Sequence, residues 1–290
     1  MPDTGEHHCS CHKNMSEEEI ALAIKAAASL GIEKIRITGG EPLVRNDIVK
    51  ICEGAAHTEG IKEVCITTNG ILLPKYAADL KKAGVSRLNI SLDTLDAKKY
   101  AYITKYGELK DALQGIEAAL TEGFEKIKLN AVLIGGFNDD EIADLANLTY
   151  KWPVDMRFIE MMPMYDSGDF NKNSFIPCTR VLNALPQMER KPKDDTVAKL
   201  YTLPGAKGNI GLISPVSNHF CAECNRVRLT SDGMIKPCLH SDSEFSIKGL
   251  PYEKMIQVFR KAICAKPEKH KELSYAERTE SHRTMNEIGG

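Results

Sequence analysis

The stretch Lys34-Ile35-Arg36-Ile37-Thr38-Gly39-Gly40-Glu41-Pro42 is a short β-rich run that ends in small and polar residues. Similar runs recur at residues 63–67, 87–91, 126–133 and 155–161. Segments with helical spacing of apolar residues separate them, at 47–56, 74–83, 111–122 and 139–150. Strands that alternate with helices pair in parallel through right-handed crossovers, so the pattern predicts an α/β fold with five parallel strands.

Polar groups follow every one of these runs. The pattern is compatible with an open Rossmann-like sheet and with a partial (β/α) barrel, and in both the chemistry lies at the C-terminal ends of the strands. Any single turn of this kind is also an ordinary βα connection, which favours the same residues. Taken as a set, they predict a ligand-lined barrel mouth. The groups are those of residues 38–42, Thr67-Thr68-Asn69-Gly70, Ser91-Leu92-Asp93-Thr94, Asn130 and Glu160-Met161-Met162-Pro163.

The flanking regions follow other patterns. Ser16 and the acidic residues after it predict a helix that runs to Leu30. Beyond Pro163 the βα rhythm stops, and a loop-rich segment with a short helix near 179–185 follows. A hairpin of residues 199–203 and 209–213 and a helix over 252–264 come next.

Composition narrows the class of protein. The chain has 290 residues, enough for one large α/β domain or a domain with an extension, and a net charge of −2. A nearly balanced charge provides no global field to attract nucleic acid or a membrane surface. No apolar run is long enough to span a bilayer, so we expect a cytoplasmic protein. Its nine cysteines are then expected to be thiols or metal ligands and not disulfides.

Cys221, Cys224 and Cys238 are the strongest chemical signal in the chain. The pair Asp232-Gly233 predicts a hairpin turn that returns Cys238 to the side of the first two cysteines. Three converging thiolates suit a zinc knuckle whose fourth ligand is His219 or His240. They suit equally an iron–sulfur cluster with one iron free of protein ligands. The spacing does not decide between these two metal sites.

Cations alternate along several predicted strands. Lys34 and Arg36 face the same way, and Lys128 and Arg157 could join them inside a barrel to form a polyphosphate site. The alternative is that some of them face helices and extend their charged ends to solvent. Arg226, Val227 and Arg228 lie between the cysteines, where two guanidinium groups on one face of a strand suit a phosphate. A solvated pair on an edge strand is the alternative.

A second group of metal-binding side chains lies at residues 7–12, with the sequence His-His-Cys-Ser-Cys-His. Its C-x-C spacing is not that of a structural zinc site, so we favour an incidental or weakly metal-binding loop.

These motifs together resemble the GTP 3′,8-cyclase family of radical S-adenosylmethionine (SAM) enzymes, which open molybdenum cofactor biosynthesis. The resemblance runs from Met1 to Gly290 and implies a partial (β/α)6-type TIM barrel of the radical SAM kind over residues 1–163. A cluster-binding α+β extension would follow over 164–290. The motifs are Thr38-Gly-Gly-Glu-Pro-Leu, Thr67-Thr-Asn-Gly, Ser91-Leu-Asp-Thr-Leu-Asp, Arg157-Phe-Ile-Glu-Met-Met-Pro, Cys221-x2-Cys-Asn-Arg-x-Arg-Leu-Thr-x-Asp-Gly with the later Cys238, and the terminal Gly-Gly.

The resemblance implies a role for each candidate residue. Three cysteines would hold a [4Fe–4S] cluster whose free iron meets guanine, and a Gly-Gly tail would enter the active site. Cations would bind GTP, and residues at the barrel mouth would contact SAM. The residues are Cys221, Cys224 and Cys238 for the cluster; Arg36, Thr67, Lys128, Arg226, Val227 and Arg228 for GTP, with Lys34 and Arg157 as helpers; Gly40, Glu41, Ser91 and Met162 for SAM; and Gly289 and Gly290 for the tail.

The implied reaction starts with reductive cleavage of SAM to a 5′-deoxyadenosyl radical. That radical takes hydrogen from ribose C3′, and the new carbon radical attacks guanine C8. An electron donor and, as the next enzyme of the pathway, cyclic pyranopterin monophosphate synthase are implied partners. A homodimer is compatible with the resemblance.

The sequence departs from the family at its start. Family members carry C-x3-C-x2-C after a first strand, with Met-Pro after the third cysteine, and this sequence begins at Met1-Pro2. We therefore expect the first strand and the ligands of a second [4Fe–4S] cluster to be absent, and the chain as written to be inert in the radical step unless it is extended. The alternative is an inert remnant that binds GTP and one cluster. A C-x3-C-x2 run encoded in frame just before Met1 would support the extended enzyme. An iron content of about four atoms per chain is what the remnant predicts.

Overall fold

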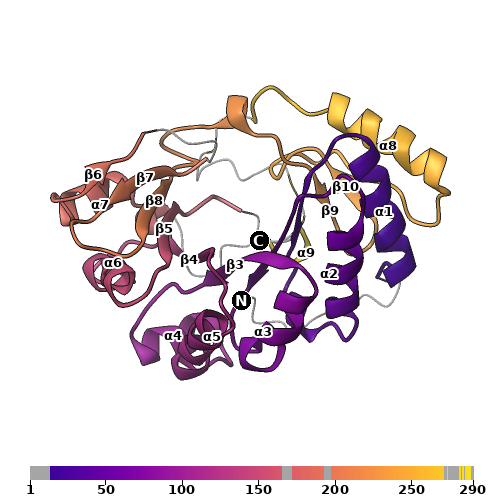
Figure 1. Cartoon of the computed structure of the whole chain (residues 1–290). Helices are drawn as coiled ribbons and strands as arrows, with labels where there is room; N and C mark the ends of the chain where they lie inside the picture. Colours follow the sequence, from indigo (N-terminus) through magenta and orange to yellow (C-terminus); the bar gives the residue numbers. More distant parts are fainter. Residues whose placement is uncertain are drawn as a thin grey trace.

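The computed structural model describes residues 14–164, 172–192, 197–270, 273, 281, 283 and 285–288. Its main element is a curved sheet with strand order β1-β2-β3-β4-β5-β8-β7-β6, and helices line its outer side (Figure 1). The strands are β1 (Lys34–Ile37), β2 (Glu63–Thr68), β3 (Val85–Ser91), β4 (Ile127–Leu133), β5 (Asp155–Glu160), β6 (Glu189–Arg190), β7 (Lys199–Thr202) and β8 (Asn209–Ile213).

Six neighbouring strands of this sheet are parallel, which corrects the predicted count of five. Strands β1 to β5 pair in sequence order, as the alternation of strands and helices predicts. The sixth is β8, which pairs in parallel with β5 and antiparallel with β7. The predicted hairpin of β7 and β8 therefore forms, but it also extends the barrel sheet. The large sheet continues past residue 163, and the division into two domains there stays a prediction.

The helices cover the sheet through their apolar faces. The predicted helices form as α2 (Ile48–His57), α3 (Leu73–Lys82), α5 (Leu109–Thr121), α6 (Ile142–Lys151) and α7 (Thr179–Ala184). Helix α4 (Ala97–Thr104) was not predicted, although Asp96 caps it by accepting hydrogen bonds from the backbone of Lys98 and Lys99. The main hydrophobic core lies between the sheet and these helices.

Side-chain alternation on β1 orients the predicted cations. Ile35 and Ile37 pack against the main core, on the helix side of the sheet. Lys34 and Arg36 alternate with them and remain solvent-accessible. Because successive side chains of a strand point to opposite faces, both cations face the interior of the barrel. The alternative that these two extend among the helices is therefore wrong.

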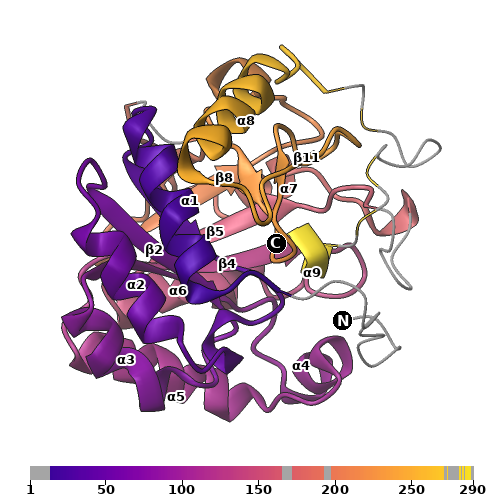
Figure 2. The same cartoon turned by 90° about the vertical axis from the view of Figure 1, so that its right-hand side faces the viewer.

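A smaller unit packs on one side of the barrel. It consists of a three-stranded sheet in the order β11-β10-β9 and a helix. The helix lies beside α1 in both views (Figures 1 and 2). These elements are α1 (Glu17–Ser29), β9 (Arg228–Leu229), β10 (Met234–Lys236), β11 (Phe245–Ser246) and α8 (Tyr252–Cys264); a short α9 (Met285–Ile288) ends the described chain.

Helix α1 contributes to two cores at once. It begins at Ser16, which forms the predicted capping box with Glu19. Ile24 belongs to the main core, whereas Ala23, Ala26 and Ala27 belong to a second core with residues of α8 and β10. Small side chains on this face let α8 approach closely. Helix α1 therefore packs against both the barrel and the extension.

We expect Ala26→Leu to weaken this joint. Ala26 is fully buried, and added methyl groups would overpack the α1–α8 contact, at a cost of about 1–3 kcal/mol in the free energy of unfolding. Ala21→Leu is the matched control, because Ala21 is exposed on the same helix. Urea unfolding measures both variants, and equal stabilities would contradict the assigned packing.

Candidate functional site

A cavity of about 180 Å³ lies at the C-terminal ends of β1, β2 and β3. The predicted residues Gly40, Thr67 and Ser91 line it, so the structure brings them together. Thr67 therefore lies with residues predicted for SAM, although it was predicted for GTP. The remaining lining residues are Thr38, Gly39, Thr68 and Asn69.

Glu41 ties two βα turns together beside this cavity. Its Oε1 accepts hydrogen bonds from the Leu43 backbone (3.0 Å) and the Thr68 hydroxyl (2.7 Å), and its Oε2 accepts one from the Asn69 backbone (2.7 Å). Burial raises the pKa of the carboxyl group, while these hydrogen bonds oppose the shift. Both oxygens are thus engaged by the protein, and a contact between Glu41 and an ammonium group stays a prediction.

Met162 lies apart from this lining. It follows β5, which is separated from β3 by β4 in the sheet, and it does not line the cavity in the described part of the chain. Its predicted contact with SAM also stays a prediction.

The predicted cations converge inside the barrel. Lys128 on β4 and Arg157 on β5 are buried. The charge of Arg36 on β1 acts on Arg157 and also on Arg228 of β9. Burial, together with the charges of Arg36, Arg87 and Arg226, lowers the pKa of Arg157 to about 10, against the opposing effect of Asp155. Cations from both halves of the chain thus repel one another across a common space.

Among these cations, Lys128 has the most strongly lowered pKa. Burial first, and then the charges of Arg157 and Arg87, lower its pKa to about 7. Arg36 also has a lowered pKa, first because of desolvation and then because of Arg226. Such a group of cations is stabilised when an anion enters it.

Arg87 is a member of this group that we did not predict. It lies on β3 in register with Cys65, and its guanidinium group contacts Glu63 at 2.7 Å. Glu63 also contacts Lys34 at 2.6 Å, so one carboxylate holds two cations. The signal was present in the sequence, because Arg87 shares a strand face with Asn89 and Ser91.

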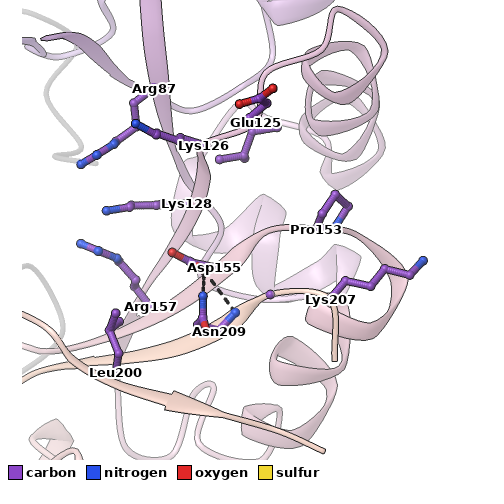
Figure 3. Close-up of a pocket in the computed structure, with 12 residues that line it drawn as sticks. Arg87, Glu125, Lys126, Lys128, Pro153, Asp155, Arg157, Leu200, Lys207 and Asn209 are labelled. Atoms are coloured by element: carbon purple, nitrogen blue, oxygen red, sulfur yellow. Dashed lines mark hydrogen bonds between the residues drawn. The ribbon is translucent and has the colours of Figure 1, made fainter. Parts of the chain in front are cut away.

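A second cavity, of about 410 Å³, lies at the starting ends of β4, β5 and β8. Arg87, Lys128 and Arg157 extend in the same direction along one side of it (Figure 3). Asp155 accepts hydrogen bonds from the backbone and side chain of Asn209 (3.1 and 2.7 Å). The lining also contains Glu125, Lys126 and Lys207, so five cations face two carboxylates and the space is positive.

The cysteine segment forms the predicted hairpin. β9 and β10 pair antiparallel, and the turn contains Gly233 at φ 88°, a conformation that favours glycine. The strand is shorter than predicted, since β9 contains Arg228 but not Arg226. The thiols of Cys224 and Cys238 both lie near Arg228, where they oppose the lowering of its pKa to about 10 by burial and by Arg226.

The described cysteines are free thiols. Across the described ranges, no three His, Cys, Asp or Glu side chains are arranged to hold a metal ion. The zinc and the iron–sulfur alternatives for Cys221, Cys224 and Cys238 both stay predictions.

Lys266, just beyond α8, joins the two arms of the cysteine hairpin. Its ammonium group donates to the carbonyl oxygens of Arg226 (2.7 Å) and Pro237 (2.9 Å) and lies 3.6 Å from the sulfur of Cys224. Sequence reasoning missed Lys266, because nothing in its spacing connects it to the cysteines.

The end of the described chain lies beside Arg228, which donates to the Ile288 carbonyl oxygen at 3.3 Å. Arg283 anchors this segment through Asp232 (3.0 Å) and Glu244 (2.6 Å). Gly289 and Gly290 lie outside the described residues, as do residues 7–12.

We expect Lys128 to make stability depend on pH. Its folded pKa lies below its unfolded value, so between pH 7 and 9 the unfolded chain binds more protons and the free energy of unfolding rises with pH. Lys128→Met should remove about 2 kcal/mol of this rise. Urea unfolding of the ligand-free protein at both pH values measures it, with exposed Lys82→Met as control. An unchanged rise in Lys128→Met would contradict the buried position of this amine.

We expect Lys266→Met to loosen the cysteine hairpin. Loss of two charge-assisted hydrogen bonds should speed amide hydrogen exchange in residues 221–238 by about tenfold or more in the metal-free protein. Lys254→Met, an exposed position on α8, is the control. Exchange that matches wild type would show that Lys266 does not hold the hairpin.

Family comparisons agree with this geometry. Residues 7–149 match the Radical SAM superfamily, and residues 154–272 match Molybdenum Cofactor Synthesis C. The chain is 15% identical to SuiB of Streptococcus suis bound to S-adenosylmethionine, with a TM-score of 0.65 over 89% of this chain and 60% of that one. This likeness shows a shared fold.

Curated relatives are much closer in sequence. The GTP 3′,8-cyclase of Alkaliphilus oremlandii is 47% identical over 97% of this chain and 90% of its own length. That of Peptoclostridium acidaminophilum is 49% identical over 86% of this chain and 78% of its own length. With a partial barrel, interior cations and a cysteine hairpin in the same chain, this protein belongs to the GTP 3′,8-cyclase family of radical SAM enzymes.

Proposed function

We propose that this protein, when a [4Fe–4S] cluster that reduces SAM is also in place, cyclises GTP to (8S)-3′,8-cyclo-7,8-dihydroguanosine 5′-triphosphate, a lyase reaction that opens molybdenum cofactor biosynthesis. One observation carries the proposal: cations from the barrel and from the cysteine hairpin are buried in a common interior space, where burial first and then their mutual charges lower the pKa values of Arg157 and Arg228. A triphosphate is the chemical group that such a space stabilises best. The relatives named GTP 3′,8-cyclase agree with it.

The residues of the barrel interior would bind and orient the triphosphate. Arg36, Arg226 and Arg228 can each donate two parallel hydrogen bonds to phosphate oxygens. Lys128 and Arg157 would add positive charge from the neighbouring strands β4 and β5. Lys128 is in register with Asp155, two residues before Arg157. Lys34 reaches the same face from the start of β1, and Val227 would contribute its backbone.

The 180 Å³ cavity would hold part of SAM, with Gly40 and Ser91 at its wall and Thr67 between the two ligands. Glu41 fixes the shape of this wall by joining the turns after β1 and β2. When bound and reduced by one electron, SAM would supply methionine and a 5′-deoxyadenosyl radical, the group that would take hydrogen from ribose C3′. Met162 would approach from the end of β5.

Cys221, Cys224 and Cys238 would hold a [4Fe–4S] cluster with one iron open to guanine. Lys266 would keep the two arms of the hairpin at a fixed separation, because its ammonium group contacts both arms and lies beside the sulfur of Cys224. The contact between Arg228 and Ile288 supports a tail of Gly289 and Gly290 directed to the same site.

The product would pass to cyclic pyranopterin monophosphate synthase, and reduction of SAM requires an external electron donor. None of the described helices is long and apolar enough to cross a membrane.

The decisive experiment uses the polypeptide translated from the complete reading frame. With GTP, SAM and a reductant under anaerobic conditions, we expect 5′-deoxyadenosine and a 3′,8-cyclised nucleotide, both identified by mass spectrometry. Deuterium at ribose C3′ should appear in 5′-deoxyadenosine. Cleavage of SAM without transfer of that deuterium would contradict the proposed reaction.

The cluster assignment has its own test. Replacing Cys221, Cys224 and Cys238 together by Ser should lower the iron content after anaerobic reconstitution by about four atoms per chain. Cys264→Ser, an exposed cysteine on α8, is the control. An unchanged iron content, or zinc that is lost with the three cysteines, would refute the assignment.

A further inference from the structure

Glu63 occupies an unusual position among the cations of the barrel. It is the first residue of β2, between Lys34 on β1 and Arg87 on β3. Its two oxygens contact different cations, Oε2 with Lys34 at 2.6 Å and Oε1 with Arg87 at 2.7 Å. A carboxylate bridging two cations resembles a phosphate in charge and in reach.

The contact between Glu63 and Arg87 is an ion pair without hydrogen-bond alignment. Glu63 Oε1 has no hydrogen-bond partner among the described residues, although the Arg87 nitrogen is close. The Nε atoms of Arg87 and Arg157 are likewise buried and lack an acceptor in the described part of the chain. Two guanidinium groups that border one cavity therefore keep donors available for an incoming anion.

The position of this bridge along the strands fits the far end of a triphosphate. Arg87 precedes Ser91 by four residues on β3, a distance of about 13 Å along the strand. The proposed reaction requires ribose C3′ to lie next to SAM, which would occupy the cavity that Ser91 lines. A phosphate chain that extends from the ribose towards the strand starts ends near Lys34 and Arg87.

We propose that Glu63 is the resting occupant of a terminal-phosphate site, and that the terminal phosphate of a nucleoside triphosphate displaces it from Lys34 and Arg87. The proposal rests on the proposed function and adds two residues to it: Arg87 as a phosphate ligand and Glu63 as an exchangeable counterion. Before binding, Glu63 neutralises charge that would otherwise destabilise the empty barrel. Because the carboxylate competes with the phosphate, it also limits how tightly a triphosphate binds.

The test measures the affinity of anaerobically reconstituted protein for GTP and GMP by calorimetry. Glu63→Gln should bind GTP about tenfold more tightly than wild type and GMP equally well, because GMP lacks the terminal phosphate. Arg87→Met should bind GTP at least about tenfold more weakly, again with little change for GMP. The ligand-free Glu63→Gln protein should unfold at a lower temperature than wild type and gain more stability from GTP.

Two control variants remove the same charges elsewhere. Glu125→Gln removes an exposed carboxylate from the rim of the same cavity, and Lys62→Met removes an exposed cation next to Glu63 in the chain. Both should bind GTP as wild type does. If Glu125→Gln tightened GTP binding as much as Glu63→Gln, a general field effect would replace the proposed exchange.

The outcomes separate the inference from the proposed function. Failure of wild type to bind GTP would refute the proposed function itself. If wild type binds GTP but Glu63→Gln binds it no more tightly, the exchange is refuted while the function stands. Equal gains for GTP and GMP would likewise refute the terminal-phosphate site. If Glu63→Gln does not fold, Arg87→Met decides, and an unchanged GTP affinity in that variant overturns the proposal.

Discussion

The structure depends on one electrostatic constraint, the gathering of cations on the inner face of a barrel with few protein anions to balance them. Burying cations and placing like charges on neighbouring strands both cost free energy, and the pKa values of Lys128 and Arg157 are lowered by burial first and by neighbouring cations second. The surrounding core of the sheet and helices holds the strands together in spite of it. The site is therefore organised for an anion before the anion arrives, which is how binding sites gain affinity from preorganisation.

Much of the barrel follows from local sequence signals. Period-two strands, capped helices and Asp-Gly turns are decided within a few residues, so β1 to β5, α1 and α8 form at or near their predicted positions. The cation face was also predictable, because Lys34 and Arg36 alternate with isoleucines that pack on helices. Arg87 could have been found by the same alternation.

Other features depend on contacts between distant segments and could not be predicted in this way. Strand β8 has the local pattern of a hairpin, and its second partner, β5, is more than forty residues away in the sequence. Lys266 acts on Arg226 and Pro237 through a tertiary approach that no spacing encodes. The predicted barrel and extension share elements as well: strands β6 to β8 belong to the barrel sheet, and helix α1 contributes to both cores.

The alanine face of α1 has a consequence for synthesis in the cell. Its partner α8 lies about 220 residues later in the chain, and a ribosome adds roughly 5–20 residues per second. That face consequently stays uncovered for roughly ten to forty seconds while the barrel strands emerge. Apolar surface that stays exposed for so long during synthesis favours aggregation, and the cysteine hairpin can only be assembled near the end of translation.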